Sequence, residues 1–238
     1  MNLQDILSDI RKVDKDFNLI EPNDHICIGI SGGKDSIVLL EAFNQLRKFK
    51  DYSFGITAIH LDLGFIEQDY SLVKEYCDKN NIPFYIEKTQ IAVELLKETK
   101  NGLVSCSKCS KYKKACIIQA ALKYNCNSIA FAHHIDDAIE TLFMNMMHGG
   151  RISSFKPKTY LEKSNLKFIR PLIYTKESLV NHVAKQLELP IIKNNCPNDK
   201  KTERQYIKER LNELYKHSNQ IHDNFKKCLF EENVDLWK

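Results

Sequence analysis

Short apolar runs alternate with amphipathic stretches along most of the chain. Apolar runs bounded by turn-forming residues are typical of buried strands, and an apolar period of about 3.6 residues is typical of helices. The predicted strands are HICIGI (25–30), FGITAIHLDL (54–63), PFYIEKT (83–89) and SIAFAHH (128–134). The predicted helices cover 35–49, 67–81, 91–99, 111–125 and 136–148.

This alternation predicts an α/β fold with a doubly wound, mostly parallel sheet. From about residue 151 the pattern changes, with a candidate last strand at 167–171 and helices expected at 175–189 and 201–217. We expect the C-terminal segment to be helical.

The chain contains no low-complexity linker that would divide it. We therefore expect one catalytic domain over residues 1–215, with a short helical lead at 1–20. A helical or loose tail is expected at 216–238.

The composition is that of an ordinary globular protein, with 43% hydrophobic and 28% charged residues among 238. No apolar run reaches the roughly 18–20 residues of a membrane-spanning helix. The first residues, MNLQDILSDIRKVDKDF, mix acids and bases, unlike a secretory signal. We expect a cytoplasmic protein, and the formal charge of +4 permits a nucleic-acid partner.

The hexapeptide SGGKDS (31–36) lies directly between a predicted strand and a predicted helix. Its glycines let several N–H groups point into one concavity, and the positive end of the following helix favours an anion there. Lys34 can add a positive charge, and Asp35 and Ser36 can cap the helix. The spacing is neither that of a Walker A loop nor GxGxxG. A plain strand-to-helix turn is the alternative. The candidate phosphate-binding residues are Ser31, Gly32, Gly33, Lys34, Asp35 and Ser36.

Two other predicted strands end in polar residues, at Asp62 and at His133-His134-Ile135-Asp136-Asp137. Ligands of doubly wound sheets bind beyond the carboxyl ends of the strands, so we expect these residues to lie near the hexapeptide. Paired acids at this edge can hold Mg²⁺ or position an attacking group. Alternatively, Asp136 and Asp137 only cap a helix and Asp62 only caps a strand end.

Eight cysteines in a reducing compartment are more often buried, metal-binding or catalytic than disulfide-bonded. Cys106 and Cys109 form a CxxC pair at the start of a helix, among lysines that favour the thiolate, and Cys196 lies in a loop. The others lie singly in apolar or helical patterns and are expected to be small buried side chains, namely Cys27, Cys77, Cys116, Cys126 and Cys228.

Several uses of the three clustered thiols remain open. They suffice for an iron–sulfur cluster that leaves one iron open. A zinc site would need a fourth ligand, such as a distant histidine. A redox CxxC pair, or Cys106 and Cys196 as a persulfide-carrying and resolving pair, would also fit the spacing.

SGGKDS resembles the PP-loop of the ATP-pyrophosphatase superfamily, whose members split ATP between the α- and β-phosphates and transfer AMP to a substrate oxygen. Three further segments, SCSKCSKYKK (105–114), AFAHHIDDAIETLFMNMMHGGRISSFKPK (130–158) and IRPLIYTKE (169–177), are similar to the tRNA 2-thiocytidine synthetase family. So is the stretch from Cys196 through Gln205, and the match runs from about residue 22 to 215.

The resemblance implies a Rossmann-like, adenine nucleotide α-hydrolase-like fold. It also implies a function as an ATP-dependent tRNA sulfurtransferase that converts an anticodon-loop cytidine to 2-thiocytidine. Cys106, Cys109 and Cys196 match the positions that hold a 4Fe-4S cluster, which receives the incoming sulfur. Lys113 and Asp137, with Asp136 beside it, match catalytic positions.

ATP, Mg²⁺ and the cluster are the implied cofactors, and tRNA and a cysteine desulfurase-derived sulfur donor are the implied partners of a homodimer. Asp62, His133 and His134 join the hexapeptide as candidate ATP contacts. The candidate tRNA or phosphate contacts are Lys158, Arg170, Lys201 and Arg204.

The chain departs from the family in one motif. The family usually has a second CxxC around the third ligand, where this sequence reads Lys-Asn-Asn-Cys and keeps only Cys196. The alternatives are a cluster-free PP-loop ligase that forms lysidine or an amide, a persulfide-using thiolase of another tRNA base or small molecule, and a nucleotide-binding sensor.

Overall fold

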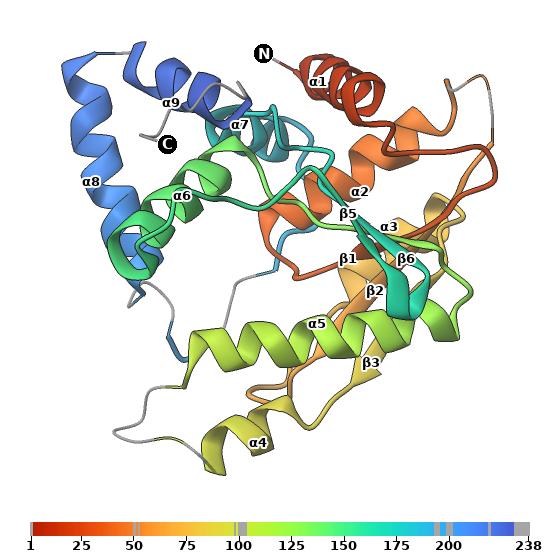
Figure 1. The fold of residues 1–238 in the computed structure, drawn as a ribbon. Coiled ribbons are helices and arrows are strands. Elements are labelled where there is room, and N and C mark those ends of the chain that lie inside the picture. The colour runs from red at the N-terminus through yellow and green to blue at the C-terminus, as the bar shows by residue number, and fades with distance from the viewer. Residues whose placement is uncertain are drawn as a thin grey trace.

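A six-stranded sheet forms the centre of the computed structural model (Figure 1). The structure describes residues 2–49, 51, 53–97, 99, 104–192, 196–198, 202–218 and 220–230. The strand order is β3-β2-β1-β4-β6-β5, and every pairing is parallel except β5 with β6. The strands are β1 (His25–Gly29), β2 (Gly55–Asp62), β3 (Phe84–Lys88), β4 (Ser128–Ala130), β5 (Lys158–Leu161) and β6 (Leu166–Ile169).

Helices cover both faces of the sheet. Ile26 and Ile28 of β1 point into a core shared with α1, α2 and α7, whereas Cys27 between them packs in a second core with α5. Figure 1 accordingly shows α5 on one side of the sheet and α1, α2 and α7 on the other. The helices are α1 (Leu3–Phe17), α2 (Lys34–Leu46), α3 (Ser71–Lys79), α4 (Ile91–Lys97), α5 (Cys106–Lys123), α6 (Ile135–Gly149), α7 (Glu177–Gln186), α8 (Glu203–His217) and α9 (Gln220–Phe230), with a 3₁₀ turn at Glu162–Ser164.

The predicted doubly wound, mostly parallel α/β sheet is confirmed. Its order reverses between β1 and β4, because β2 and β3 extend to one side and β6 and β5 to the other. A crevice at such a reversal is where doubly wound sheets bind ligands. The segments that follow β1, β2 and β4 all begin at the same edge of the sheet, because these strands are parallel neighbours.

Some elements differ from the sequence prediction. β5 was not predicted, because its four residues are half-buried or exposed and lack an apolar run. β4 ends at Ala130, although Phe131 still donates its N–H to Ile169 O at 3.0 Å. α5 begins at Cys106, so that the CxxC pair lies on its first turn.

The C-terminal part of the described chain is helical. α8 ends at His217, as predicted for the helix at 201–217, and α9 packs on α6 through Phe225 against Phe143, with ring centroids 5.0 Å apart. Among the described residues, no helix is both long and apolar enough to cross a bilayer.

The burial of the isolated cysteines was only partly predicted. Cys27, Cys77 and Cys126 are buried, but Cys116 is half-buried and Cys228 is exposed. The prediction is wrong for Cys228 because α9 covers the neighbouring helices with its other face.

Candidate active site

The phosphate loop is a tight turn closed by two serines. The Ser36 hydroxyl donates to Gly33 O at 2.9 Å and accepts the Ser31 N–H at 3.2 Å. Gly32 has φ +82°, a backbone conformation that disfavours every side chain. A Cβ on Gly32 would also lie 3.1 Å from the Cβ of Ile192. This turn therefore requires glycine at position 32.

The expected side-chain cap of α2 is wrong. Its N-cap is Gly33, because the Ser36 hydroxyl is used inside the turn and the Asp35 carboxylate pairs with Lys34, its Oδ1 3.1 Å from Nζ. A glycine cap has no side-chain acceptor, so the first N–H groups of α2 remain available to an anion. The helix dipole adds to their attraction for phosphate.

The Lys34 ammonium is already paired. Besides Asp35 it donates to Glu177 Oε1 at 3.1 Å. Burial disfavours its charge, but the Asp35 and Glu177 carboxylates outweigh burial and raise the pKa of Lys34. Much of the attraction of the loop for phosphate must therefore come from backbone N–H groups.

Asp62 lies at the end of β2, beside the phosphate loop. Its Oδ1 accepts the Gly64 N–H at 2.9 Å. Burial, aided by the negative charge of Asp62, raises the pKa of Tyr70 to about 12. The Tyr70 hydroxyl would be 3.6 Å from a Cβ on Gly32. Tyr70, which the sequence did not single out, thus lies near both Asp62 and the phosphate loop.

The three candidate thiols lie close together. Burial raises the pKa of Cys109, and the neighbouring Cys196 and Cys106 raise it further, whereas the Lys113 ammonium lowers it. Lys113 stands one turn after Cys109 on α5, as the spacing predicts. The structure therefore brings together the thiols and the lysine that the sequence proposed for one site.

Asn198 fastens the Cys196 segment to the start of α5. Its buried side chain donates to Val104 O at 2.6 Å, accepts the Val104 N–H at 3.3 Å and lies 3.2 Å from Cys106 Sγ. Sequence reasoning missed Asn198, although its place two residues after a candidate ligand was a usable signal.

Three thiols have the donor chemistry of an iron–sulfur site. Within the described residues, no group of three or more histidine, cysteine, aspartate or glutamate side chains surrounds a single metal-ion position. In a cluster each thiolate binds its own iron, so the three sulfur atoms need not converge on one point. Cys106 and Cys196 are exposed at the surface, whereas Cys109 is buried.

The thiol site also adjoins the phosphate loop. Ile192 donates its N–H to Gly32 O at 2.8 Å. Cys196 follows by four residues, which span at most about 14 Å even when fully extended. On the other side, Cys109 packs in a small core with Leu63 and Phe65, which follow Asp62. The loop and the thiols thus share one edge of the sheet.

The His134–Asp137 segment forms the start of α6. His134 N donates to Asp137 Oδ2 at 3.0 Å and Asp137 N donates to His134 Nδ1 at 3.3 Å, which is a capping box. Because a backbone N–H can only donate, His134 Nδ1 is the acceptor of the Asp137 N–H. The capping role that was weighed for Asp137 is therefore present, and its remaining oxygen, Oδ1, accepts from Arg204 at 3.0 Å.

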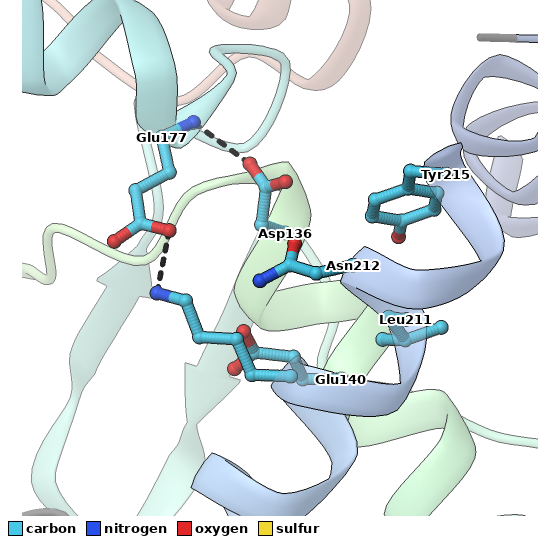
Figure 2. Close-up of a pocket in the computed structure, with 7 residues that line it drawn as sticks. Asp136, Glu140, Glu177, Leu211, Asn212 and Tyr215 are labelled. Carbon is cyan, nitrogen blue, oxygen red and sulfur yellow. Dashed lines mark hydrogen bonds and ion pairs between the residues drawn. The ribbon is translucent and has the colours of Figure 1, made fainter.

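Asp136 joins the starts of two helices to α9. Its Oδ2 accepts the Glu177 N–H at 2.7 Å, and its Oδ1 lies 3.1 Å from His222 Nε2. Figure 2 shows Asp136 and Glu177 facing each other at the edge of a small cavity of about 20 Å³, room for a single water molecule. Both oxygens of this candidate catalytic acid are thus engaged within the protein.

The Arg204 guanidinium of α8 is paired with side chains of α6. Besides Asp137 it donates to Glu140 Oε2 at 3.4 Å and Thr141 Oγ1 at 3.0 Å. Burial, and then the Asp137 charge, raise the pKa of Glu140 to about 7. A candidate phosphate contact therefore fastens α8 to α6.

His133 and Arg170 lie together on the β6 side of the crevice. Burial lowers the pKa of His133 to about 4 and that of Arg170 to about 10. The Arg170 guanidinium lies 4.8 Å from the Phe155 ring centroid, and its Nη1 donates to Lys156 O at 2.6 Å.

Lys158, a further candidate cation, is bound at a different place. Lys158 donates to Asn18 O at 2.6 Å and to Glu21 Oε1 at 3.2 Å, in the segment between α1 and β1. Lys201 lies outside the described residues.

Known proteins resemble this chain over most of its length. It is 34% identical over 211 residues to the tRNA-cytidine(32) 2-sulfurtransferase of Idiomarina loihiensis, covering 87% of this chain and 69% of that protein. It is 31% identical over 222 residues to the protein of the same name from Pelobacter propionicus, covering 92% and 82%.

The fold has a solved counterpart. The U34-tRNA thiolase NcsA from Methanococcus maripaludis with its 4Fe-4S cluster aligns with a TM-score of 0.71 at 21% identity, over 94% of this chain and 76% of that chain. Residues 4–215 match the family model of the PP-loop domain. This chain therefore belongs to the PP-loop domain family, among the relatives of the tRNA-cytidine(32) 2-sulfurtransferases.

Proposed function

We propose that this protein is an ATP-dependent tRNA sulfurtransferase that converts a cytidine to 2-thiocytidine. One observation carries the proposal: the phosphate loop and the three thiols share one edge of the sheet, and a hydrogen bond of 2.8 Å from Ile192 N to Gly32 O holds the chain at the loop four residues before Cys196. Adenylation and sulfur insertion act in turn on the oxygen and the carbon of one C2 carbonyl group, so the two sites must lie close together. The named relatives act on tRNA cytidine, which supports the choice of substrate.

The first step activates the base. Backbone N–H groups of Gly32, Gly33 and the start of α2 bind the phosphates of ATP·Mg²⁺. The C2 carbonyl oxygen attacks the α-phosphorus, pyrophosphate leaves, and the base carries AMP on that oxygen. Asp62 lies beside the loop and is our candidate nucleotide contact.

The second step replaces the activated oxygen. Cys106, Cys109 and Cys196 would hold a 4Fe-4S cluster, which when bound would supply the sulfur for this replacement. The oxygen departs with AMP as the new carbon–sulfur bond forms. Lys113 favours the thiolate of Cys109 and can stabilise negative charge that develops nearby.

The acids at the start of α6 have positioning roles in this scheme. Asp137 holds Arg204, and Asp136 holds the first N–H of α7. We propose that they keep α6, α7 and α8 in register around the crevice. A direct catalytic role for Asp137 requires that its Oδ1 exchange Arg204 for the substrate.

The cellular setting is part of the proposal. We propose that the protein works in the cytoplasm as a homodimer and receives sulfur from a cysteine desulfurase. The resemblance to the tRNA 2-thiocytidine synthetases supports each of these points, and cross-linking the protein to a desulfurase in cell extract tests the donor.

Mass spectrometry of tRNA nucleosides tests the function directly. Cells without this protein should lack 2-thiocytidine in tRNA and regain it on complementation. The anaerobically purified protein should form AMP and pyrophosphate only with ATP and unmodified tRNA. An unchanged thionucleoside profile would overturn the proposal.

A further inference from the structure

We propose that Lys208 of α8 is a reserve counter-ion for Glu177, which allows Lys34 to exchange Glu177 for a phosphate of the bound nucleotide. The inference rests on the proposed function, because it assumes that the phosphate loop binds ATP. Lys208 and Glu177 are then positioning residues, which act on the nucleotide through Lys34.

The Glu177 carboxylate is held by two ammonium groups. Lys34 Nζ lies 3.1 Å from Oε1, and Lys208 Nζ lies 2.6 Å from Oε2. The exposed fractions of the three side chains are 28% for Lys34, 19% for Glu177 and 33% for Lys208. Partial burial strengthens these contacts beyond those of surface ion pairs.

The backbone of Glu177 is fixed as well. Its N–H donates to Asp136 Oδ2 at 2.7 Å, a contact visible in Figure 2. Glu177 is also the first residue of α7, where the helix dipole favours a negative charge. The carboxylate therefore stays in place when one of its partners moves.

The charges around Lys34 are balanced before any nucleotide arrives. Two ammonium groups, Lys34 and Lys208, face two carboxylates, Glu177 and Asp35. A triphosphate that recruits Lys34 must therefore compete with Glu177. If Lys34 were the sole partner, its departure would leave a half-buried carboxylate unpaired, which is costly.

Lys208 removes that cost. Its contact with Glu177 is the shorter of the two and persists when Lys34 turns to phosphate. Arg204, one turn earlier on α8, holds the helix to Asp137 and so keeps Lys208 in reach.

A double-mutant cycle on the full-length protein tests the inference. The quantity measured is the Kd of the Mg²⁺ complex of α,β-methylene-ATP, by calorimetry at fixed salt. K208M should weaken binding on the order of tenfold, because Glu177 then holds Lys34 alone. E177Q should leave binding unchanged or tighten it, because Lys34 then has Asp35 as its one remaining carboxylate partner of the two.

The coupling between Lys208 and Glu177 distinguishes this mechanism from a simple long-range attraction of the Lys208 charge for the nucleotide. In the E177Q background K208M should lose most of its effect, and in the K34M background neither change should matter. R210M is the matched control, because Arg210 lies on the same helix but pairs with Glu213 at the exposed surface, 2.9 Å away. Its Kd should stay within about twofold of wild type.

The outcomes are distinct. A wild-type protein that does not bind the analogue overturns the proposed function. If the wild-type protein binds the analogue but the effects of K208M and E177Q are additive, only the reserve role of Lys208 is overturned. The same holds if both variants bind the analogue more weakly. If E177Q does not fold, the cycle of wild type, K34M, K208M and K34M/K208M tests the same mechanism, because K208M should have no effect once Lys34 is removed.

Discussion

Replacing Asn198 by alanine should release the third thiol from the site. The side chain makes two hydrogen bonds with the backbone of Val104, at 2.6 and 3.3 Å, and one contact of 3.2 Å with Cys106 Sγ. At about 1 kcal/mol for each neutral hydrogen bond, with the sulfur contact weaker, the loss is about 2–3 kcal/mol. The equilibrium between attached and detached Cys196 segments should then shift roughly 30- to 160-fold.

Iron binding reports this shift. After anaerobic reconstitution at limiting iron and sulfide, N198A should hold much less iron per chain than wild type and lose its thiolase activity in parallel. Nucleotide affinity should change little, because these contacts of Asn198 go to Val104 and Cys106 and not to the phosphate loop. N181A is the matched control, because Asn181 lies on α7 and the Asn198 contacts with Val104 and Cys106 do not involve that helix. Wild-type iron content in N198A would refute the role of Asn198 in holding the Cys196 segment in the site.

Three further expectations follow from single residues. Gly32→Ala should cost roughly 1–2 kcal/mol of stability and abolish ATP-analogue binding, whereas Gly33→Ala, with φ −70°, should keep wild-type stability in urea unfolding. Lys113→Met should raise the apparent pKa of Cys109 in iodoacetamide alkylation and slow thiolation on the order of ten- to hundredfold; an unshifted alkylation profile would contradict the pairing. Glu140 has a folded pKa of about 7 against 4.5 unfolded, so the native state retains its proton longer and stability falls as pH rises through this window. Urea unfolding at pH 5 and 8 should show a loss on the order of 3 kcal/mol or less that Glu140→Gln abolishes, and wild-type stability that increases with pH would exclude it.

The sequence predicted the parts of this protein that depend on local pattern. The strands before SGGKDS, Asp62 and His133 are apolar runs, and a parallel sheet brings their carboxyl ends to one edge. The CxxC spacing likewise placed Cys106 and Cys109 on one turn of helix.

The pairing of charges could not be predicted in this way. Lys34 and Glu177 stand 143 positions apart, and only the packing of α2 beside α7 makes them partners. For the same reason Arg204 and Lys158 looked like free cations in the sequence, although acids and carbonyls distant in the chain bind both. Asn198 was missed because, although it stands two residues after Cys196, its partner Val104 lies 94 positions away in the chain.

The Asn198 contacts also determine whether the chain entropy of closing the thiol site is lost on folding or on iron binding. Roughly 90 residues separate Cys109 from Cys196, and closing a loop of that length costs about 4 kcal/mol of chain entropy. Here folding of the polypeptide closes the loop through amide and backbone contacts. Loading with iron therefore need not organise the chain, and the protein should survive cycles of oxidative loss and repair without unfolding, in contrast to small zinc modules that collapse when stripped.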